Sequence, residues 1–381
     1  MLDSASAVRA LNISRGSLYV YVSRGLIRSV PHPSEPKARL YSASDIMALI
    51  DRRTRMRRPR AAAATALDYG LPVLRSGITR FEDNCCFYRG KEAVAFSRKA
   101  KLEEAARLLW NTGEVDPFAD VRFDPRAIKG WAAVASKYAP ARATSRASML
   151  LPLLVPGEVT TGFAGAARLV VALVAAIAGI ETGYAGPLHR AIANAWQRPK
   201  AADAIRRALV LLADHELNAS TFAVRVVAST GAELTDCVIA GLAAMGGPKH
   251  GGATAQLDAM LAEIEASDAT SVLATRLGRG ETLPGFGNSV YRDADPRGAE
   301  LISAVKLCPA MAAALRAARE MARVEPNVDF GLLALERGFD LPAGASLALF
   351  AMGRSIGWIA HAFEQQARGG LIRPRAEFVV A

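Results

Sequence analysis

Residues 208–228 read ALVLLADHELNASTFAVRVVA, in which a polar heptapeptide joins two apolar runs of helix-forming residues. Such runs predict two buried helices, because Ala and Leu favour helix and an apolar surface of this length belongs in a core. The heptapeptide at 214–220 needs partners for its polar groups, and a bound ligand can supply them. A network satisfied within the core would explain the same pattern, so the residues alone leave both interpretations open.

The composition is that of a folded, mainly helical chain. Of the 381 residues, 51% are hydrophobic, 22% are charged and 7% are aromatic, which excludes a disordered protein and allows two or three domains. The longest apolar run, residues 169–180, is too short to cross a bilayer and predicts a buried helix. The chain start lacks the apolar core of a signal peptide, and the four cysteines show no metal-binding spacing. We therefore expect a cytoplasmic protein with reduced thiols, no metal and no membrane contact.

A second polar segment, GGPKHGGA at 246–253, precedes another helical pattern. Its glycines let a ligand approach the backbone closely, and the start of a helix provides positive potential that keeps His250 neutral. A neutral imidazole can polarise a carbonyl group. A tight turn with an incidental histidine is the competing interpretation.

Acidic and basic residues complete the candidate chemistry. Asp329 lies between Val328 and Phe330, and an apolar setting raises the pKa of a carboxyl group towards the range that suits a general base. Arginines gathered at one pocket would bind a dicarboxylate through their guanidinium forks, although isolated arginines usually lie at the surface. The candidates are Arg297 in PGFGNSVYRDADPR, Arg354 in GRSIGWIAH and Arg373 in RPR.

Six segments, DHELNAST, GPKHGGA, PGFG…YRDADPR, VDF, GRSIGWIAHAFEQ and IRPR, follow one another in an order that resembles the signature segments of the citrate synthase family. The likeness extends from about residue 70 to the end of the chain. It implies an all-α fold, in the main, with a large and a small helical domain over residues 67–381. The small subdomain, at roughly 215–325, would be inserted in the large one, and the protein would be a homodimer.

The resemblance also assigns roles to the matching residues. His250 would hydrogen-bond the enol oxygen of acetyl-CoA while Asp329 removes a methyl proton, and His215 would contact oxaloacetate. The arginines that would hold the oxaloacetate carboxylates are Arg297, Arg354 and, across the dimer, Arg373 of the partner subunit. Acetyl-CoA is the implied co-substrate, and no cofactor would be bound permanently. The residues that would surround the CoA moiety are Leu283, Pro284, Gly285, Phe286, Gly287 and Arg292.

The chain departs from the family pattern at one catalytic position. Where the family has GFGH, this sequence has Gly287 followed by Asn288, so the histidine that polarises the oxaloacetate carbonyl and protonates the forming alkoxide is missing. Asn288 can donate a hydrogen bond but cannot transfer a proton. Losing such a donor outright costs about 2.7–4 kcal/mol, and a neutral replacement costs less. Lys249, in place of the usual Leu, would favour the neutral form of His250.

Residues 1–51 have a different character. Their pattern predicts a helix, a turn at 12–14, a second helix capped by Ser14 and a wing-like loop, and it resembles the winged helix-turn-helix domains of the MerR/excisionase type. A basic linker follows at 52–66. Residues 1–60 carry 12 Lys/Arg and four Asp/Glu, a net charge of +8 out of +11 for the whole chain, which favours a polyanionic partner such as DNA.

The sequence therefore predicts an acyltransferase of the citrate synthase type, which condenses acetyl-CoA with oxaloacetate to citrate and CoA, with an activity impaired or altered by Asn288. A 2-methylcitrate synthase-like enzyme is one alternative. Another is a metabolite-responsive DNA-binding regulator on a degenerate synthase scaffold, and a third makes the N-terminal domain a protein-interaction module. His189 and His361 are expected to be structural residues.

Overall fold

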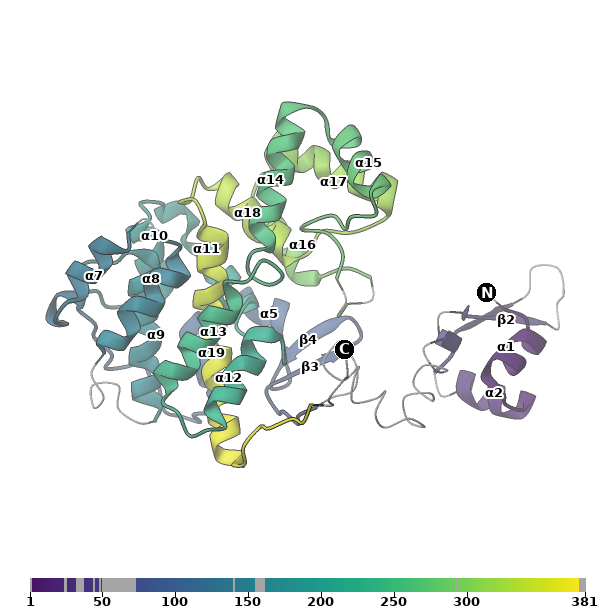
Figure 1. Ribbon diagram of the computed structural model, residues 1–381, viewed down its shortest axis with the longest axis horizontal. Coiled ribbons are helices and arrows are strands. Elements are labelled where there is room, and N and C mark those ends of the chain that lie inside the picture. The colour runs from purple at the N-terminus through teal and green to yellow at the C-terminus, as the bar shows by residue number, and fades with distance from the viewer. Residues whose placement is uncertain are drawn as a thin grey trace. The chain divides into compact units, whose positions relative to one another are not determined.

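The computed structural model describes residues 2–23, 26–31, 38–49 without 44 and 48, and 73–376 without 140, 155–161, 289 and 292. The chain divides into two compact units, residues 1–75 and 76–381, and each is described by itself. Helices dominate the structure (Figure 1), so the predicted mainly α-helical fold is confirmed. None of the described helices combines the length and apolarity that crossing a membrane requires. The predicted basic linker at 52–66 lies outside the described residues.

The described part of the first unit includes two α-helices and an antiparallel hairpin, followed by further helical residues between 43 and 49. Its elements are α1 (Ser4–Leu11), α2 (Arg15–Ser23), β1 (Ser29–Pro31) and β2 (Arg39–Tyr41). α1 ends where Asn12 takes a left-handed conformation, with φ 50°, and α2 begins after Ser14, whose Oγ accepts the Ser17 N–H. A small apolar core is formed by Ala7, Leu11, Leu18, Ile27, Tyr41 and Ile46. Its classification as a winged helix-turn-helix domain stays a prediction.

A three-stranded antiparallel sheet opens the second unit. Its strands are β3 (Thr79–Glu82), β4 (Cys85–Tyr88) and β5 (Lys91–Glu92). Asp83 and Asn84 join the first two strands with φ of 47° and 62°, the left-handed pair that a two-residue hairpin turn requires. Thr79 pairs with Tyr88, and both side chains are buried.

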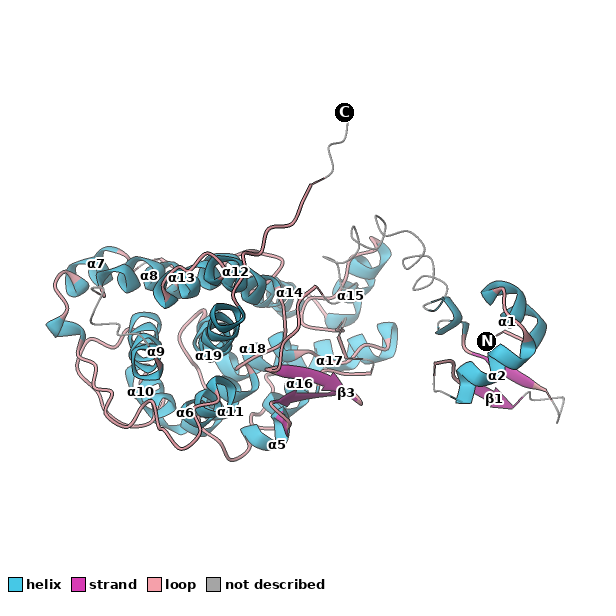
Figure 2. Ribbon diagram, turned by 90° about the horizontal axis from the view of Figure 1, so that it is seen from below, coloured by secondary structure: helices cyan, strands magenta, loops and turns pink. Residues whose placement is uncertain are grey.

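Helices form the rest of the second unit and pack around two apolar cores (Figure 2). Short 3₁₀ helices occur at Pro125–Ala127, Leu151–Leu153 and Pro199–Ala201. The α-helices are α5 (Ala93–Ser97), α6 (Leu102–Trp110), α7 (Trp131–Lys137), α8 (Ala143–Leu150), α9 (Phe163–Ala178), α10 (Leu188–Ala195), α11 (Ala202–Leu211), α12 (Ala219–Ala228), α13 (Leu234–Met245), α14 (Ala253–Ala266), α15 (Ala269–Gly278), α16 (Pro296–Ile302), α17 (Pro309–Ala322), α18 (Val328–Gly338) and α19 (Ala345–Arg368).

The larger core is centred on α9 and α19. All residues of α9 from Leu169 to Ala178 are buried, which confirms the buried helix predicted for the longest apolar run. The smaller core is formed by residues on α14, α15, α17 and α18, together with Leu283 and Phe286 of the loop between α15 and α16. α12 and α13 pack on α19, and Val224 belongs to the larger core. The predicted start of a small subdomain near residue 215 therefore falls on helices of the larger core.

Two glycines one helical turn apart let α19 approach the end of α11. A Cβ atom on Gly353 would lie 2.8 Å from the Leu209 carbonyl oxygen. On Gly357 it would lie 2.6 Å from Asp214 Oδ1, and closer still to the Ala213 carbonyl oxygen. Because these neighbours include backbone atoms, they cannot rotate away as the end of a flexible side chain can. The contact positions the connection between α11 and α12, which carries the polar heptapeptide.

We expect Gly357→Ala to lower the free energy of unfolding by about 3 kcal/mol, because the added methyl group overpacks a closed contact. The matched control is Gly278→Ala at the exposed end of α15, where no atom lies within 4 Å of the added Cβ. That change should be neutral or stabilise the protein by about 1 kcal/mol, since Ala favours helix over Gly. Urea denaturation of the two variants tests the difference. Equal stabilities would contradict the close approach.

Candidate active site

Asp214 fixes the connection between α11 and α12. Its side chain is fully buried, and Oδ2 accepts hydrogen bonds from Thr79 Oγ1 at 2.6 Å and from the Glu216 N–H at 3.1 Å. The Tyr88 hydroxyl lies 3.2 Å from the Asp214 carbonyl oxygen. The sheet thus holds the chain at the residue that presents His215.

A buried network reaches Asp214 from α12 and α19. Arg225, which is fully buried, donates to Glu364 at 2.6 Å, to Gln365 at 3.1 and 3.0 Å, and to His361 Nδ1 at 3.2 Å. Since a guanidinium group can only donate, His361 Nδ1 carries the lone pair and Nε2 carries the hydrogen. That Nε2 lies 3.3 Å from Asp214 Oδ1. His361 is therefore a partnered core residue, in agreement with the sequence-based expectation.

His215 lies in an aromatic and cationic setting. Its Nε2 is 3.1 Å from the Tyr291 hydroxyl, and the Phe81 ring packs edge-on with centroids 4.8 Å apart. Burial, and then the charges of Arg297 and Arg354, hold the pKa of His215 well below its usual value. The imidazole is therefore neutral at physiological pH and can exchange hydrogen bonds without carrying a charge.

His250 lies in the connection between α13 and α14. Its Nε2 is 2.8 Å from Ser220 Oγ, which also accepts the Trp358 indole N–H at 3.2 Å. Burial, with a smaller effect of the Arg354 charge, lowers the pKa of His250 to about 4. Lys249 is exposed and is not among these causes. The expected effect of Lys249 is thus not seen, and desolvation keeps this histidine neutral.

Arg297 is buried and paired within its own segment. Its guanidinium group makes a two-point contact with Asp295, at 2.9 and 2.8 Å. Asp295 also accepts the Arg297 and Val328 N–H groups, both at 3.1 Å, so it ties the start of α16 to the start of α18. The Arg297 guanidinium carbon lies 5.4 Å from the centre of the Tyr291 ring. Arg297 is thereby held rigidly beside Tyr291 and His215.

Arg354, in the middle of α19, is a buried cation with unused hydrogen-bonding capacity. It is 1% exposed, its Nε donates to the Leu212 carbonyl oxygen at 2.7 Å, and its guanidinium carbon lies 5.0 Å from the Phe350 ring centre. Its Nη1 is buried and has no partner among the described residues. Burial lowers the pKa of Arg354, the charge of Asp214 opposes that effect, and the charge of Arg297 reinforces it. An unpaired buried guanidinium donor indicates a site for an anionic ligand.

Asp329 stands in the first turn of α18, which Asn327 caps by accepting the Asp329 N–H at 3.0 Å. Burial raises the pKa of Asp329 to about 6, and the negative charge of Asp295 adds to this while Arg297 opposes it. No hydrogen bond or ion pair joins the Asp329 carboxylate to another described residue. This carboxylate is therefore basic and free to accept a proton.

In the segment at 283–292, Asn288 lies in a different setting from the one expected of a residue that polarises oxaloacetate. Asn288 is exposed, and its Oδ1 accepts the Val290 N–H at 2.6 Å and the Tyr291 N–H at 3.1 Å. Among the described residues, no hydrogen bond connects Asn288 to His215, Arg297 or Arg354. The reason is local, because an asparagine side chain that closes such a turn is directed back to its own backbone.

The other residues predicted to contact CoA or oxaloacetate include two in the smaller core, one outside the described residues and one at the surface. Leu283 and Phe286 are buried in the smaller core, and Arg292 lies outside the described residues. Arg373 is exposed on the segment that follows α19, where the Ile372 N–H donates to Ser229 Oγ at 3.0 Å. Figure 2 shows the segment after α19 running away from the helices.

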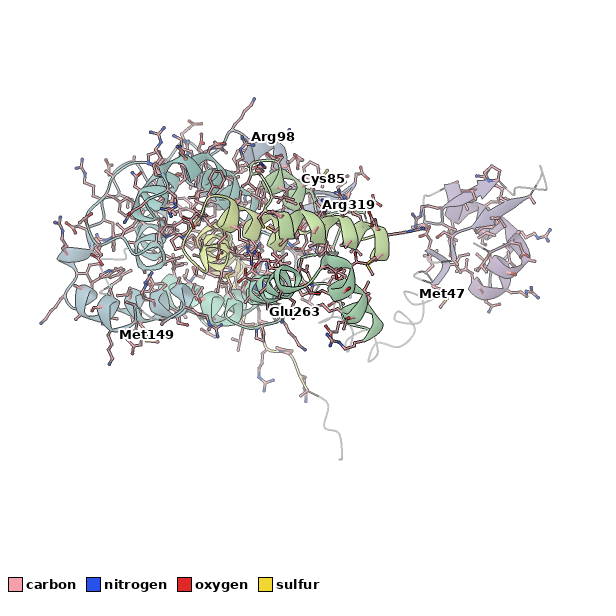
Figure 3. All side chains as sticks on the ribbon, turned by 90° about the horizontal axis from the view of Figure 1, so that it is seen from above. Met47, Cys85, Arg98, Met149, Glu263 and Arg319 are labelled. Atoms are coloured by element: carbon pink, nitrogen blue, oxygen red, sulfur yellow. The ribbon has the colours of Figure 1, made fainter. Side chains whose placement is uncertain are left out.

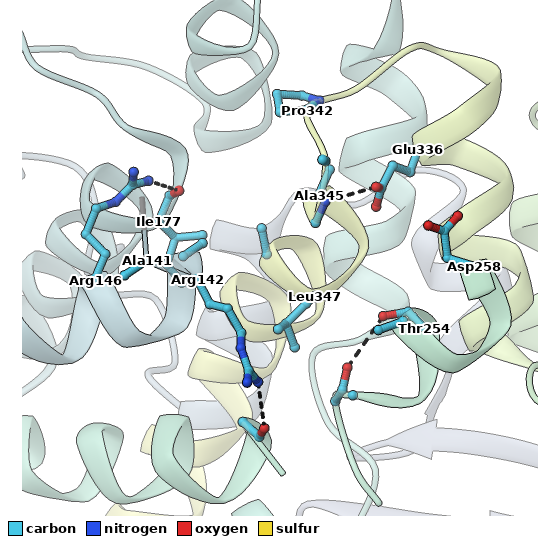
Figure 4. Close-up of a pocket in the computed structure, with 18 of the residues that line it drawn as sticks. Ala141, Arg142, Arg146, Ile177, Thr254, Asp258, Glu336, Pro342, Ala345 and Leu347 are labelled. Atoms are coloured by element: carbon cyan, nitrogen blue, oxygen red, sulfur yellow. Dashed lines mark hydrogen bonds between the residues drawn. The ribbon is translucent and has the colours of Figure 1, made fainter. Parts of the chain in front are cut away.

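A cavity of about 1190 Å³ lies beside the His250 connection (Figure 4). Its wall includes Arg142, which precedes α8, Arg146 of α8, Thr254 and Asp258 of α14, and Glu336 of α18. None of the candidate histidines, arginines or carboxylates described above lines it. Both arginines are bonded to backbone carbonyl oxygens, and Glu336 accepts the Gly344 and Ser346 N–H groups that open α19. Within the described ranges, no group of His, Cys, Asp or Glu side chains could hold a metal ion.

Comparison with known proteins identifies the family of this chain. The family model described as citrate synthase, C-terminal domain, matches residues 67–375. The chain belongs to the citrate synthase family. Putative citrate synthase 2 of Mycobacterium tuberculosis is 41% identical over 194 residues, which are 48% of this chain and 52% of that protein. The 2-methylcitrate synthase of Shewanella oneidensis is 34% identical over 182 residues, 45% of this chain and 48% of that protein. The matches thus span about half the length of these curated relatives.

Solved citrate synthases share the fold. The enzyme of Thermotoga maritima superposes with a TM-score of 0.67 at 23% identity and covers 82% of this chain and 94% of its own. The Thermoplasma acidophilum citrate synthase, in a ternary complex with carboxymethyl coenzyme A and oxaloacetate, superposes with a TM-score of 0.68 at 22% identity. That match covers 84% of this chain and 96% of the archaeal one.

Within this family fold, three residues that shape the site are not among those predicted from the sequence. Ser220 contacts His250, Asp295 holds Arg297, and Tyr291 contacts His215. The role of Asp295 was predictable, because Asp followed by Pro296 is a signal for the start of a helix. An Asp at that position caps the helix and lies close enough to pair with Arg297 two residues later. Tyr291 carried no such signal, since its direction depends on the turn that Asn288 closes.

Proposed function

We propose that this chain condenses acetyl-CoA with oxaloacetate, giving citrate and CoA, with no permanently bound cofactor. The observation that carries the proposal is a basic, half-buried carboxylate, Asp329, in a site with two neutral histidines and two buried arginines. The archaeal structure with a carboxymethyl-CoA and oxaloacetate supports the choice of substrates. The 2-methylcitrate synthase among the relatives makes propionyl-CoA the second acyl donor to test.

The residues divide the first step of this reaction between them. Asp329 removes a methyl proton from the thioester, and His250 donates a hydrogen bond to the oxygen that becomes the enol. The Ser220 hydroxyl lies 2.8 Å from His250 Nε2 and 2.7 Å from Asn218 Oδ1. Ser220 donates its single hydrogen to Asn218 Oδ1, so its oxygen accepts from His250 and the hydrogen of the imidazole lies on Nε2. For His250 to donate to the enol oxygen through Nδ1, the Ser220 hydroxyl has to turn from Asn218 to Nε2.

Condensation and hydrolysis of the thioester complete the reaction, and the buried arginines bind the carboxylates of oxaloacetate for it. The enol carbon attacks the ketone carbon of oxaloacetate, and a water molecule then cleaves the thioester to free CoA. Arg354 has a free buried donor for one carboxylate, and Arg297 supplies a second positive charge. Gly285 and Gly287, both with positive φ, shape the loop from Leu283 to Gly287 that we propose contacts CoA.

We expect the proton-abstraction step to show one acidic limb with an apparent pKa of about 6. Asp329 must be ionised to act, so the rate should fall about tenfold per pH unit below pH 6 and be flat above pH 7. His215 and His250 are neutral across this window and should add no second limb. The test is exchange of the acetyl-CoA methyl hydrogens with D₂O, followed by NMR, with malate filling the oxaloacetate site. A limb near pH 4 would contradict the assignment of a raised carboxyl pKa.

We also propose a homodimer, but not through α9, which is buried in its own subunit. Figure 2 shows α7, α8, α13 and α12 side by side as one layer. On α8, Met149 is 46% exposed and points outward (Figure 3). In such a dimer we propose that Arg373 of the partner subunit completes the oxaloacetate site. A fully active monomer in analytical ultracentrifugation at assay concentration would contradict this.

For residues 1–60 we propose weak, salt-dependent DNA binding. The support is the net charge of +8 and an exposed face of α2 that includes Arg15 and Tyr19. Fluorescence anisotropy of the full chain with random duplex DNA at low salt tests it, and affinity should fall steeply as salt rises. Absence of binding at low salt would leave the alternative of a protein-interaction module.

A further inference from the structure

The turn after Gly287 directs one side chain outward and one inward. Asn288 is exposed, and its Oδ1 is occupied by the N–H groups of Val290 and Tyr291. Tyr291, three residues later, is 5% exposed. The position at which the family has its catalytic histidine is therefore directed to the turn, while a hydroxyl group enters the site.

Groups with a direct role in the site surround the Tyr291 side chain. Its hydroxyl lies 3.1 Å from His215 Nε2, and the Arg297 guanidinium carbon lies 5.4 Å from its ring centre. Phe81 of β3 packs edge-on against the ring, with centroids 5.6 Å apart. Arg297, Arg354, Asp295 and Cys86 are the charged and titratable groups whose influence reaches Tyr291. Two of these groups are the buried arginines proposed to bind carboxylates.

A phenol in this place can do what a carboxamide cannot. Burial raises the pKa of Tyr291, so the hydroxyl keeps its hydrogen at neutral pH and can donate it. An asparagine amide also donates a hydrogen bond, but it cannot release a proton to an alkoxide. His215 is neutral and can accept from or donate to the same oxygen, so it orients the hydroxyl.

We propose that Tyr291 is the catalytic residue that polarises the 2-oxo acid carbonyl in this chain, in place of the histidine missing at position 288. The inference rests on the proposed condensation. As the enol carbon bonds to the ketone carbon, the carbonyl π electrons move to oxygen, and the Tyr291 O–H gives its proton to that alkoxide. The tyrosinate is neutralised by a proton returned through solvent from Asp329, which took one from the methyl group. Arg297 stabilises the transient anion.

The test compares Tyr291→Phe with Tyr184→Phe in two assays. Tyr184 is a second tyrosine, whose hydroxyl donates to the Val171 carbonyl oxygen at 3.0 Å away from the site. Tyr291→Phe should retain methyl-hydrogen exchange within about threefold of wild type but lose CoA release by 10²-fold or more, the usual effect of removing one oxyanion donor. Tyr184→Phe should retain both activities.

A third variant, Asn288→Ser, distinguishes the two candidate donors. Serine preserves an oxygen that can close the turn but removes the amide N–H groups. CoA release should fall less in Asn288→Ser than in Tyr291→Phe, and the reverse order would overturn the proposal. Retention of CoA release by Tyr291→Phe in an otherwise active enzyme would also overturn it, while leaving the proposed condensation intact. Absence of both exchange and CoA release in the wild type would overturn the two together.

Discussion

Asp329→Asn should reduce exchange of the acetyl-CoA methyl hydrogens with solvent by a factor of about 10³, within the range that one general base contributes. The amide has the size of the carboxylate but cannot accept the proton. No other described carboxylate with a raised pKa stands next to the buried arginines, so none can replace it. The measurement is NMR of acetyl-CoA in D₂O with malate present.

Stability measurements separate this loss from misfolding. The pKa of Asp329 in the folded state, about 6, lies above the ordinary value of 3.8. Its contribution to stability is therefore complete at low pH and is lost as pH rises through about 6. Asp329→Asn should be at least as stable as the wild type at pH 7.5, and the two should converge towards pH 4. Asp120→Asn, in an exposed loop, is the matched control for exchange. Wild-type exchange in Asp329→Asn would place the base elsewhere.

Arg354→Met should lower kcat/KM for oxaloacetate by about 10³-fold, with most of the effect in the KM for oxaloacetate and little in that for acetyl-CoA. A charge-assisted pair with a carboxylate in a desolvated site accounts for a loss of about 3–5 kcal/mol. The unpartnered Nη1 of Arg354 is the structural reason to expect this. Steady-state kinetics with each substrate varied in turn gives the split.

The corresponding lysine variant sharpens the interpretation. Arg354→Lys retains the charge without the planar fork and should recover only part of the lost affinity. Arg316→Met, at an exposed position of α17, is the control for removing an arginine. Equal KM values for oxaloacetate in wild type and Arg354→Met would show that α19 does not contribute to the dicarboxylate site.

Much of this arrangement could be predicted from the sequence because the signals are local. The apolar runs on both sides of 214–220, the glycines around His250 and the apolar neighbours of Asp329 all lie within a few residues of the group they describe. Helices form where the apolar runs predict them. The neutral state of His250 and the raised pKa of Asp329 then follow mainly from burial.

The rest depends on contacts between distant segments. The direction of Asn288 and Tyr291 is set by one turn and by a histidine 76 residues earlier in the chain. Arg225 and His361 meet across 136 residues, and no local pattern marks them as partners. The extent of the smaller core depends on such contacts too, because α12 and α13 pack on α19 although they precede α14 directly.

The proposed condensation is tested by steady-state release of CoA from acetyl-CoA and from propionyl-CoA with oxaloacetate, catalysed by the wild-type chain. We predict oxaloacetate-dependent CoA release with at least one of the two donors, slower than in an enzyme with the family histidine and lowered about 10³-fold by Asp329→Asn. CoA release that is absent with both donors, from a folded dimer that binds them, would contradict it.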